Sequence, residues 1–235
     1  MEKLSLRLRE FTAQAHRQAE GADFVKKLFR GQFTDSEYIQ YLWALREVYV
    51  EMEKWMEKQS QHPALSLVFF PELFRTQSLN QDLQAWAGTT EPEVPNHLQA
   101  EVDNYIHRLK ELAENRPELI VAHAYVRYLG DLSGGEMLGR VLQARFGDRA
   151  LNFYRYDFDD FEAKKNLYRE RLDQIGEKWP DWVEEICQEA ERAFDLNGAL
   201  FQALSQGERR PSESAPLADG SNKLKSPMAP RPERA

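Results

Sequence analysis

Apolar residues recur every three or four positions along most of this chain, which is the spacing of an amphipathic α-helix. Such stripes occupy residues 2–20 and, after a capping sequence at 34–37, continue to about residue 60. Shorter stripes at 64–70 and 78–87 lie between prolines and glycines. The same period predicts further helices over 97–115, 117–146, 160–176 and 181–206. The pattern therefore predicts an all-α fold.

Two segments depart from this pattern. Residues 153–158 are mostly aromatic and favour a strand by propensity, but no second strand is evident, so we expect an ordered loop on the core. From residue 207 onward prolines, serines and charges replace the aromatic residues. A chain of 235 residues can bury one full-sized core. We therefore expect one domain, a helical bundle over 1–206, followed by a disordered Pro- and Ser-rich tail over 207–235.

Charge and cysteine content narrow the function. The formal charge of −8 argues against a nucleic-acid partner, because phosphate binding needs a concentrated basic face. Cys187 is the chain's one cysteine, so it forms no intramolecular disulfide and is expected to be a small buried or half-buried thiol. No stretch is long and apolar enough to span a membrane, and the N-terminus carries no apolar signal region. These features predict a soluble, cytoplasmic protein.

Three glycines interrupt the predicted helix over 117–146. Gly130, Gly134 and Gly135 surround Asp131, and each interior glycine costs about 0.5–1 kcal/mol relative to alanine. They indicate either a kink with tight helix packing or a backbone that lies close to a planar ligand. Spacing alone favours the packing explanation.

Two segments carry a resemblance to a known family. Residues 122–135, Ala-His-Ala-Tyr-Val-Arg-Tyr-Leu-Gly-Asp-Leu-Ser-Gly-Gly, resemble the distal-helix signature of the haem oxygenases. Residues 12–20, Thr-Ala-Gln-Ala-His-Arg-Gln-Ala-Glu, resemble their proximal-helix motif. The resemblance implies that haem, as both substrate and cofactor, is sandwiched between a proximal helix and a kinked distal helix. The implied reaction uses O2 to open the haem ring, giving biliverdin, carbon monoxide and ferrous iron.

The resemblance implies that His16 is the axial ligand of the haem iron. His16 lies four residues before Glu20 on a polar stripe of the first helix, so the carboxylate can accept a hydrogen bond from the second ring nitrogen. By spacing alone, a surface histidine beside an acid is the more common arrangement. His123, close to the glycines, is the alternative ligand.

On the opposite face of the haem, the resemblance implies that Gly130 and Gly134 leave room for O2 and ordered water, and that Asp131 holds this water and relays protons. Without the resemblance, Asp131 is equally well a solvated helix residue or a partner for a freed backbone amide. Tyr49 and Arg127 match positions that extend the water network in related enzymes, and Asn197 is expected to close it. The alternative for Tyr49 is core packing, and the alternative for Arg127 is a surface ion pair.

Haem carries two propionates, whose negative charge calls for basic residues at the mouth of the pocket. Lys165 and Arg169 lie four residues apart, and their segment resembles the propionate-binding helix of the family, which favours cleavage at the alpha meso carbon. The resemblance adds Arg9, where relatives often have lysine, and Tyr125 as partners of the carboxylates. Residues expected to line the ring faces are Phe194 and Leu28.

Electrons for the implied reaction must come from a partner. The chain shows no dinucleotide or flavin motif, because the glycine cluster lacks the preceding strand of a nucleotide fingerprint. We therefore expect a separate reductase, either an NADPH-dependent flavin reductase or a ferredoxin, that docks through a local basic surface. In vertebrate members a similar tail leads to a C-terminal membrane anchor. If the native protein carries such an anchor after this sequence, we expect it to be membrane-associated.

Two other functions compete with the oxygenase. A haem carrier or sensor would keep the pocket without turnover, and a helical interaction module would keep only a vestige of it. A carrier has no need of Gly130, Asp131 and Gly134 together, and a vestigial module has no need of His16 with Glu20. The oxygenase is therefore the favoured hypothesis.

Overall fold

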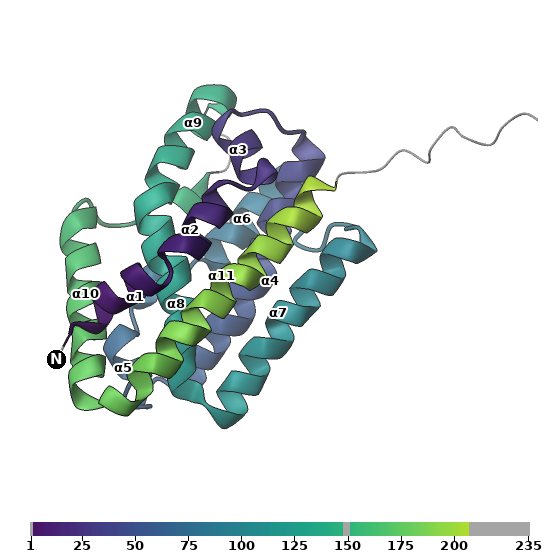
Figure 1. Ribbon diagram of the computed structural model, residues 1–235. Helices are drawn as coiled ribbons and strands as arrows, with labels where there is room; N and C mark the ends of the chain where they lie inside the picture. The colour runs from purple at the N-terminus through teal and green to yellow at the C-terminus, as the bar shows by residue number, and fades with distance from the viewer. Residues whose placement is uncertain (1, 148–150, 207–235) are drawn as a thin grey trace, which may run out of the picture.

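Residues 2–147 and 151–206 are described by the computed structural model, and within them every regular element is a helix. Figure 1 shows three long helices packed side by side, α4 (Asp35–Lys58), α7 (Asn96–Asn115) and α11 (Val183–Ser205), with α7 at the right-hand edge. Another helix, α6 (Thr76–Ala87), packs against α4. The expected all-α bundle is confirmed, whereas the tail expected over 207–235 lies outside the described residues.

Helix α4 begins at the predicted capping sequence. The Thr34 hydroxyl accepts a hydrogen bond from the Glu37 amide at 3.1 Å, and the Glu37 carboxylate accepts one from the Thr34 amide at 2.8 Å. These reciprocal bonds satisfy two amides that a helix start otherwise leaves free. The helix then carries Tyr49 into the core, where its ring centroid lies 6.1 Å from that of Tyr128.

The N-terminal segment differs from the expected continuous helix over 2–20. It forms two helices, α1 (Leu4–Phe11) and α2 (Ala13–Glu20), separated at Thr12. The buried Thr12 hydroxyl donates to the Leu8 carbonyl at 2.7 Å, a bond that competes with regular helix geometry and bends the chain. As a result α1 packs against both α10 (Phe161–Lys178) and α11, whereas α2 packs mainly against α11.

The glycine-containing segment also differs from the expected helix over 117–146. After α8 (Ile120–Ala124) the chain makes two π-helical turns, η3 (Tyr125–Leu129) and η4 (Asp131–Gly135), before α9 (Glu136–Phe146). A π-turn contains more residues than an α-turn, so it widens the helix, and such turns are frequent at functional sites. Gly147, with φ of +67°, ends α9 as its sequence position predicts.

The remaining expectations concern shorter elements. The aromatic segment at 153–158 is an ordered loop that starts in the 3₁₀ turn η5 (Asn152–Tyr154), which confirms the prediction. Cys187 is buried, as expected for a structural thiol. Within residues 2–147 and 151–206, none of the helices has the length and apolar composition needed to cross a lipid bilayer. The other short elements are α3 (Asp23–Phe29), α5 (Leu65–Val68), η1 (Pro71–Leu73), η2 (Pro117–Leu119) and η6 (Pro180–Trp182).

Candidate active site

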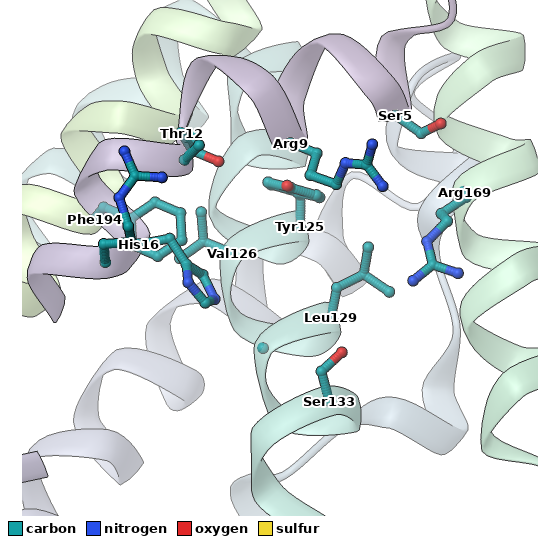
Figure 2. Close-up of a pocket in the computed structure, with 13 residues that line it drawn as sticks. Ser5, Arg9, Thr12, His16, Tyr125, Val126, Leu129, Ser133, Arg169 and Phe194 are labelled. Atoms are coloured by element: carbon teal, nitrogen blue, oxygen red, sulfur yellow. The ribbon is translucent and has the colours of Figure 1, made fainter. Parts of the chain in front are cut away.

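A cavity of about 450 Å³ lies between α1–α2 and the π-turns η3 and η4. Its volume falls within the range of about 300–1,000 Å³ found for pockets that enclose small ligands. Figure 2 shows the predicted residues His16, Arg9, Tyr125, Arg169 and Phe194 around this space. The cavity therefore unites predicted residues from four helical segments that are far apart in the sequence.

His16 lines the α2 wall of the cavity. Its Nδ1 lies 3.6 Å from a carboxylate oxygen of Glu20, and its ring packs edge-on against Phe194 with the centroids 5.6 Å apart. The Glu20 carboxylate thus engages Nδ1, which leaves Nε2 as the nitrogen available to a ligand in the cavity. An imidazole held through one nitrogen by a carboxylate is a well-oriented metal ligand.

The glycines of the facing wall fall into two groups. A Cβ atom placed on Gly130 or Gly134 would meet no other atom within 4 Å, so both positions border open space. A Cβ on Gly135 would lie 3.7 Å from the Tyr154 ring, and one on Gly139 would lie 2.9 Å from the Tyr154 Cβ. Both interpretations of the glycines are therefore realised, because Gly130 lines the cavity, Gly134 borders an adjoining space, and the other two positions admit a close-packed tyrosine.

Asp131 lies behind the glycine wall, where Tyr49 and Arg127 hold its carboxylate. The Tyr49 hydroxyl donates to one carboxylate oxygen, and Arg127 Nη2 lies 3.4 Å from the other. Burial raises the pKa of Asp131 above its usual value, although the Arg127 charge and the Tyr49 hydrogen bond oppose this effect. A carboxyl group with a raised pKa is suited to exchanging protons near neutral pH.

The hydrogen bonds continue from Arg127 into the protein. Arg127 donates to Asn197 at 2.8 Å, and Asn197 donates to the Tyr105 hydroxyl at 3.3 Å. The Tyr105 hydroxyl lies 3.2 Å from His123 Nδ1, whose Nε2 lies 3.0 Å from Glu189. This series of contacts links the site to the side of the bundle formed by α7 and α11.

His123, the alternative iron ligand, is a member of this network and not of the cavity. It is completely buried, and both ring nitrogens are engaged by Tyr105 and Glu189. Burial lowers the pKa of His123, so the ring stays neutral. Burial would also raise the pKa of Glu189, but hydrogen bonds with His123 and Arg108 lower it to about 2. This geometry favours His16 over His123 as the ligand.

Sequence reasoning missed Tyr105 and Glu189. The signal was present for Glu189, because it interrupts the apolar stripe of α11 between Ile186 and Ala190. A carboxylate in such a stripe needs a buried partner. Tyr105 carries no comparable signal, since a tyrosine on an apolar face is ordinary core packing.

Basic residues gather where the cavity approaches α10. Arg9 from α1 and Arg169 from α10 line the cavity with Tyr125, and the two guanidinium groups lie on the same side in Figure 2. Arg169 also donates to Asn166 at 2.8 Å. Arg17, which the sequence reasoning did not select, is a further cation in the lining. These groups are able to bind carboxylates of a ligand.

Two of the residues expected to contact the haem directly, Lys165 and Leu28, lie outside the cavity lining. Lys165 pairs with Glu162 one turn earlier on α10 and does not line the cavity, because its flexible side chain turns along its own helix. Leu28 on α3 is buried in the core and is likewise absent from the lining. Sequence spacing shows which residues share a face of a helix, but it does not show which neighbouring element that face contacts.

Comparisons with known proteins agree with one another. A model of the family described as heme oxygenase matches residues 2–203. "Heme oxygenase 1" of Synechocystis sp. is 40% identical over 205 residues, which cover 86% of this chain and 84% of the relative. "Heme oxygenase 1" of Homo sapiens is 37% identical over 209 residues, covering 86% of this chain and 72% of the relative.

Solved structures give the same result. The crystal structure of heme oxygenase-1 from Synechocystis in complex with heme has a TM-score of 0.80 at 38% identity, and the match covers 87% of this chain and 93% of that one. The structure of heme oxygenase from Leptospira interrogans has a TM-score of 0.77 at 33% identity, with coverage of 85% and 98%.

Proposed function

This chain belongs to the haem oxygenase family, and we propose that it binds haem in the cavity between α2 and the π-turns, with His16 as the axial ligand of the iron. Its activity is the oxidative degradation of haem to biliverdin, with carbon monoxide and ferrous iron as the other products. The family is established by sequence, whereas the role of each residue is our proposal.

The cavity fits the chemistry of haem, a flat apolar ring with a central metal and two carboxylates. The α2 wall offers His16 Nε2 to the metal, because Glu20 engages the other ring nitrogen. The opposite wall is flattened at Gly130, and Gly134 borders the adjoining smaller cavity; at both positions a Cβ would project into open space. Arg9 is positioned to bind a carboxylate at the cavity mouth. The observation that carries the proposal is this pairing of an oriented imidazole with a glycine wall.

When bound, haem supplies the iron that binds O2 and the ring carbon that is oxidised. The protein's part is to orient the ring and to move protons. We propose that Asp131 holds water on the O2 side of the pocket and exchanges protons with it through its carboxyl oxygens. Tyr49 and Arg127 fix the position of that carboxyl group and keep its acidity in a useful range.

The propionate contacts are proposed for Arg9, Arg169 and Tyr125, with Phe194 against the ring. Lys165 remains a proposed partner only if it exchanges Glu162 for a propionate, which a lysine side chain can do by rotating about its own bonds. These contacts would select one rotational setting of the haem, and the alpha meso carbon is the proposed position of cleavage.

We propose that electrons come from a separate donor protein, an NADPH-dependent flavin reductase or a ferredoxin. Arg17 supports docking of an acidic donor beside the cavity, because it is not assigned to a propionate and has no carboxylate partner within the described part of the chain. Such docking depends on charge, so raising the ionic strength should slow electron delivery. An unchanged rate of haem reduction at high salt would argue against a charged interface.

An absorbance time course tests the function. The protein is loaded with one equivalent of haem in air, and a reducing partner is added in the presence of catalase. Conversion of the Soret band to a red-absorbing bilin, with release of carbon monoxide, is the expected result. A stable ferrous or oxygenated spectrum would indicate a haem carrier, and no Soret change on adding haem would leave only an interaction module.

The limits of the catalytic unit and its cellular location are also proposals. We propose that residues 2–206 suffice for haem degradation, because they contain every residue assigned above. A chain truncated after residue 206 should therefore retain bilin formation. The proposed location is the cytoplasm, where the reduced thiol of Cys187 would persist. Cell fractionation of the full-length chain tests this location.

A further inference from the structure

Three tyrosines meet at the inner end of the site. Tyr38 and Tyr41 come from the first turns of α4, and Tyr154 comes from η5. All three are buried, with exposed fractions of 0%, 7% and 8%, and the rings of Tyr38 and Tyr41 lie 6.2 Å apart. The Tyr154 hydroxyl is close enough to those of Tyr38 and Tyr41 to interact electrostatically with both. None of these residues has a role in the function proposed above.

The Tyr154 hydroxyl interacts with the hydroxyls of Tyr38 and Tyr41, but the bonding capacity of these groups is incompletely used. Neither the Tyr38 hydroxyl nor the Tyr154 hydroxyl has a hydrogen-bond partner among the described protein atoms. A buried hydroxyl without a partner loses its bonds to water and gains none in return. Native proteins usually satisfy such groups with another polar atom or an ordered water molecule, and polar groups separated by slightly more than bonding distance are commonly bridged by water.

Space for such water exists beside these tyrosines. A second cavity of about 160 Å³ is lined by Tyr41 and Tyr154, with Arg127 and Asp131 also in its wall. A buried water molecule occupies about 30 Å³ and needs two to four polar partners. Gly130 lines this cavity as well as the larger one, so the two spaces adjoin. Most of the remaining lining is apolar, but the cavity has the volume for water and offers it the polar groups of Tyr41, Tyr154, Asp131 and Asn197.

We propose that Tyr41 and Tyr154 line a water-binding chamber beside Asp131, and that Tyr38, which is outside the cavity lining but interacts with the Tyr154 hydroxyl, supplies a further hydroxyl to the ordered water. Phenylalanine would fill the same three positions equally well and would leave a dry apolar space, so the hydroxyls are what give the chamber its affinity for water. Because Asp131 lines the chamber, water held there is available to its carboxyl group. The inference rests on the proposed function only for the role of Asp131, since water binding needs no haem.

Crystal structures of the full-length chain, with and without haem and at a resolution that shows ordered water, test the chamber directly. We expect solvent density within hydrogen-bond distance of the Tyr154 hydroxyl and of at least one of the other two. Xenon under pressure should leave this chamber empty in the natural chain and enter it in the triple variant Tyr38→Phe, Tyr41→Phe, Tyr154→Phe, because dry apolar cavities bind xenon. Xenon in the chamber of the natural chain would overturn the proposal.

The sign of a stability change gives a second test. If water partners the Tyr154 hydroxyl, Tyr154→Phe removes hydrogen bonds and lowers the thermal midpoint. Tyr168→Phe is the matched control, because the Tyr168 hydroxyl is equally buried and unpartnered but has burial as the sole influence on its pKa. Tyr168 lines neither of the two cavities, so no space for water adjoins its hydroxyl, and the loss of that hydroxyl should raise the midpoint or leave it unchanged.

A Tyr154→Phe variant that gains stability as Tyr168→Phe does would show a dry hydroxyl and overturn the chamber. Haem titration of the same proteins separates this failure from that of the proposed function. If adding haem to the natural chain gives no Soret change, haem binding is refuted, but the solvent density in the chamber of the haem-free protein still tests the chamber. Normal haem binding with a dry chamber would refute only the chamber.

Discussion

The hydroxyl of Tyr49 donates a hydrogen bond to the carboxylate of Asp131, and this contact joins the middle of α4 to the second π-turn. The bond spans 82 positions of sequence and places the acid directly behind the glycine wall. Since Tyr49 is fully buried, its position is fixed by core packing. The candidate proton donor is therefore positioned by the same helix that organises the bundle.

Replacing Asp131 tests its proposed role. Asp131→Ala should still bind haem, because the carboxylate lies behind the cavity wall, but bilin formation should fall by about 100-fold or more, the usual contribution of a positioned acid or base. Bilin yield per haem consumed is the measurement. Glu136→Gln is the control, since Glu136 pairs with exposed Arg140 on the next turn. Normal bilin output from Asp131→Ala would refute the assignment.

Removing the Tyr49 hydroxyl should change the pH dependence of the reaction. The hydrogen bond from Tyr49 lowers the pKa of Asp131 against the larger raising effect of burial. Tyr49→Phe should therefore raise that pKa further and move the corresponding limb of the pH–rate profile to higher pH. Bilin formation measured across the pH range gives the shift. An unmoved profile would mean that Tyr49 acts only through core packing.

Loss of the His16 side chain should change the iron spectrum. His16→Ala leaves the arginines and the glycine wall in place, so haem should still enter the cavity, but the native axial ligation should be lost. The ferric absorption and electron paramagnetic resonance spectra report the ligand directly. His107→Ala, at an exposed position of α7, is the control. A native spectrum from His16→Ala would require another ligand and a rearrangement that frees His123.

The two groups of glycines should respond oppositely to alanine. Gly139→Ala should destabilise the protein by about 1–3 kcal/mol, because its Cβ would lie 2.9 Å from the Tyr154 Cβ. Gly130→Ala meets no atom and should stabilise the helix by about 0.5–1 kcal/mol while weakening haem binding. Denaturant unfolding and haem titration measure the two effects. Equal destabilisation by both changes would contradict this division.

Protonation of His123 should destabilise the fold at low pH. Burial lowers the pKa of His123 below its ordinary value of 6.5, so the unfolded chain binds a proton that the folded protein does not. Stability is therefore complete above pH 6.5 and falls as the pH drops through 6.5 toward the lower folded value. Urea unfolding of the natural chain and of His123→Gln measures this slope, which the variant should reduce. His107→Gln should leave it intact.

The sequence was sufficient for the helical period, the capping box at Thr34 and the proximal and distal segments. It was not sufficient for the break at Thr12, because threonine is tolerated within helices and only its buried hydroxyl bond reveals the bend. The glycines predicted an irregularity in the helix over 117–146, but no residue pattern distinguishes a π-turn from an ordinary kink. Spacing identified which residues share a helix and could not determine which of them reach the cavity, as Lys165 and Leu28 illustrate.

Arg127 stands in the middle of the network that leads from Asp131 to Glu189. A guanidinium group has only donors and keeps its protons at any physiological pH. Asn197 accepts a hydrogen bond from Arg127 through its amide oxygen, and an amide side chain does not titrate. Proton transfer along the network is therefore interrupted at Arg127 and Asn197, so a proton at Glu189 cannot reach Asp131 by this route. Asp131 therefore exchanges protons with its immediate partner Tyr49 and with solvent on the cavity side, and not with the groups beyond Arg127.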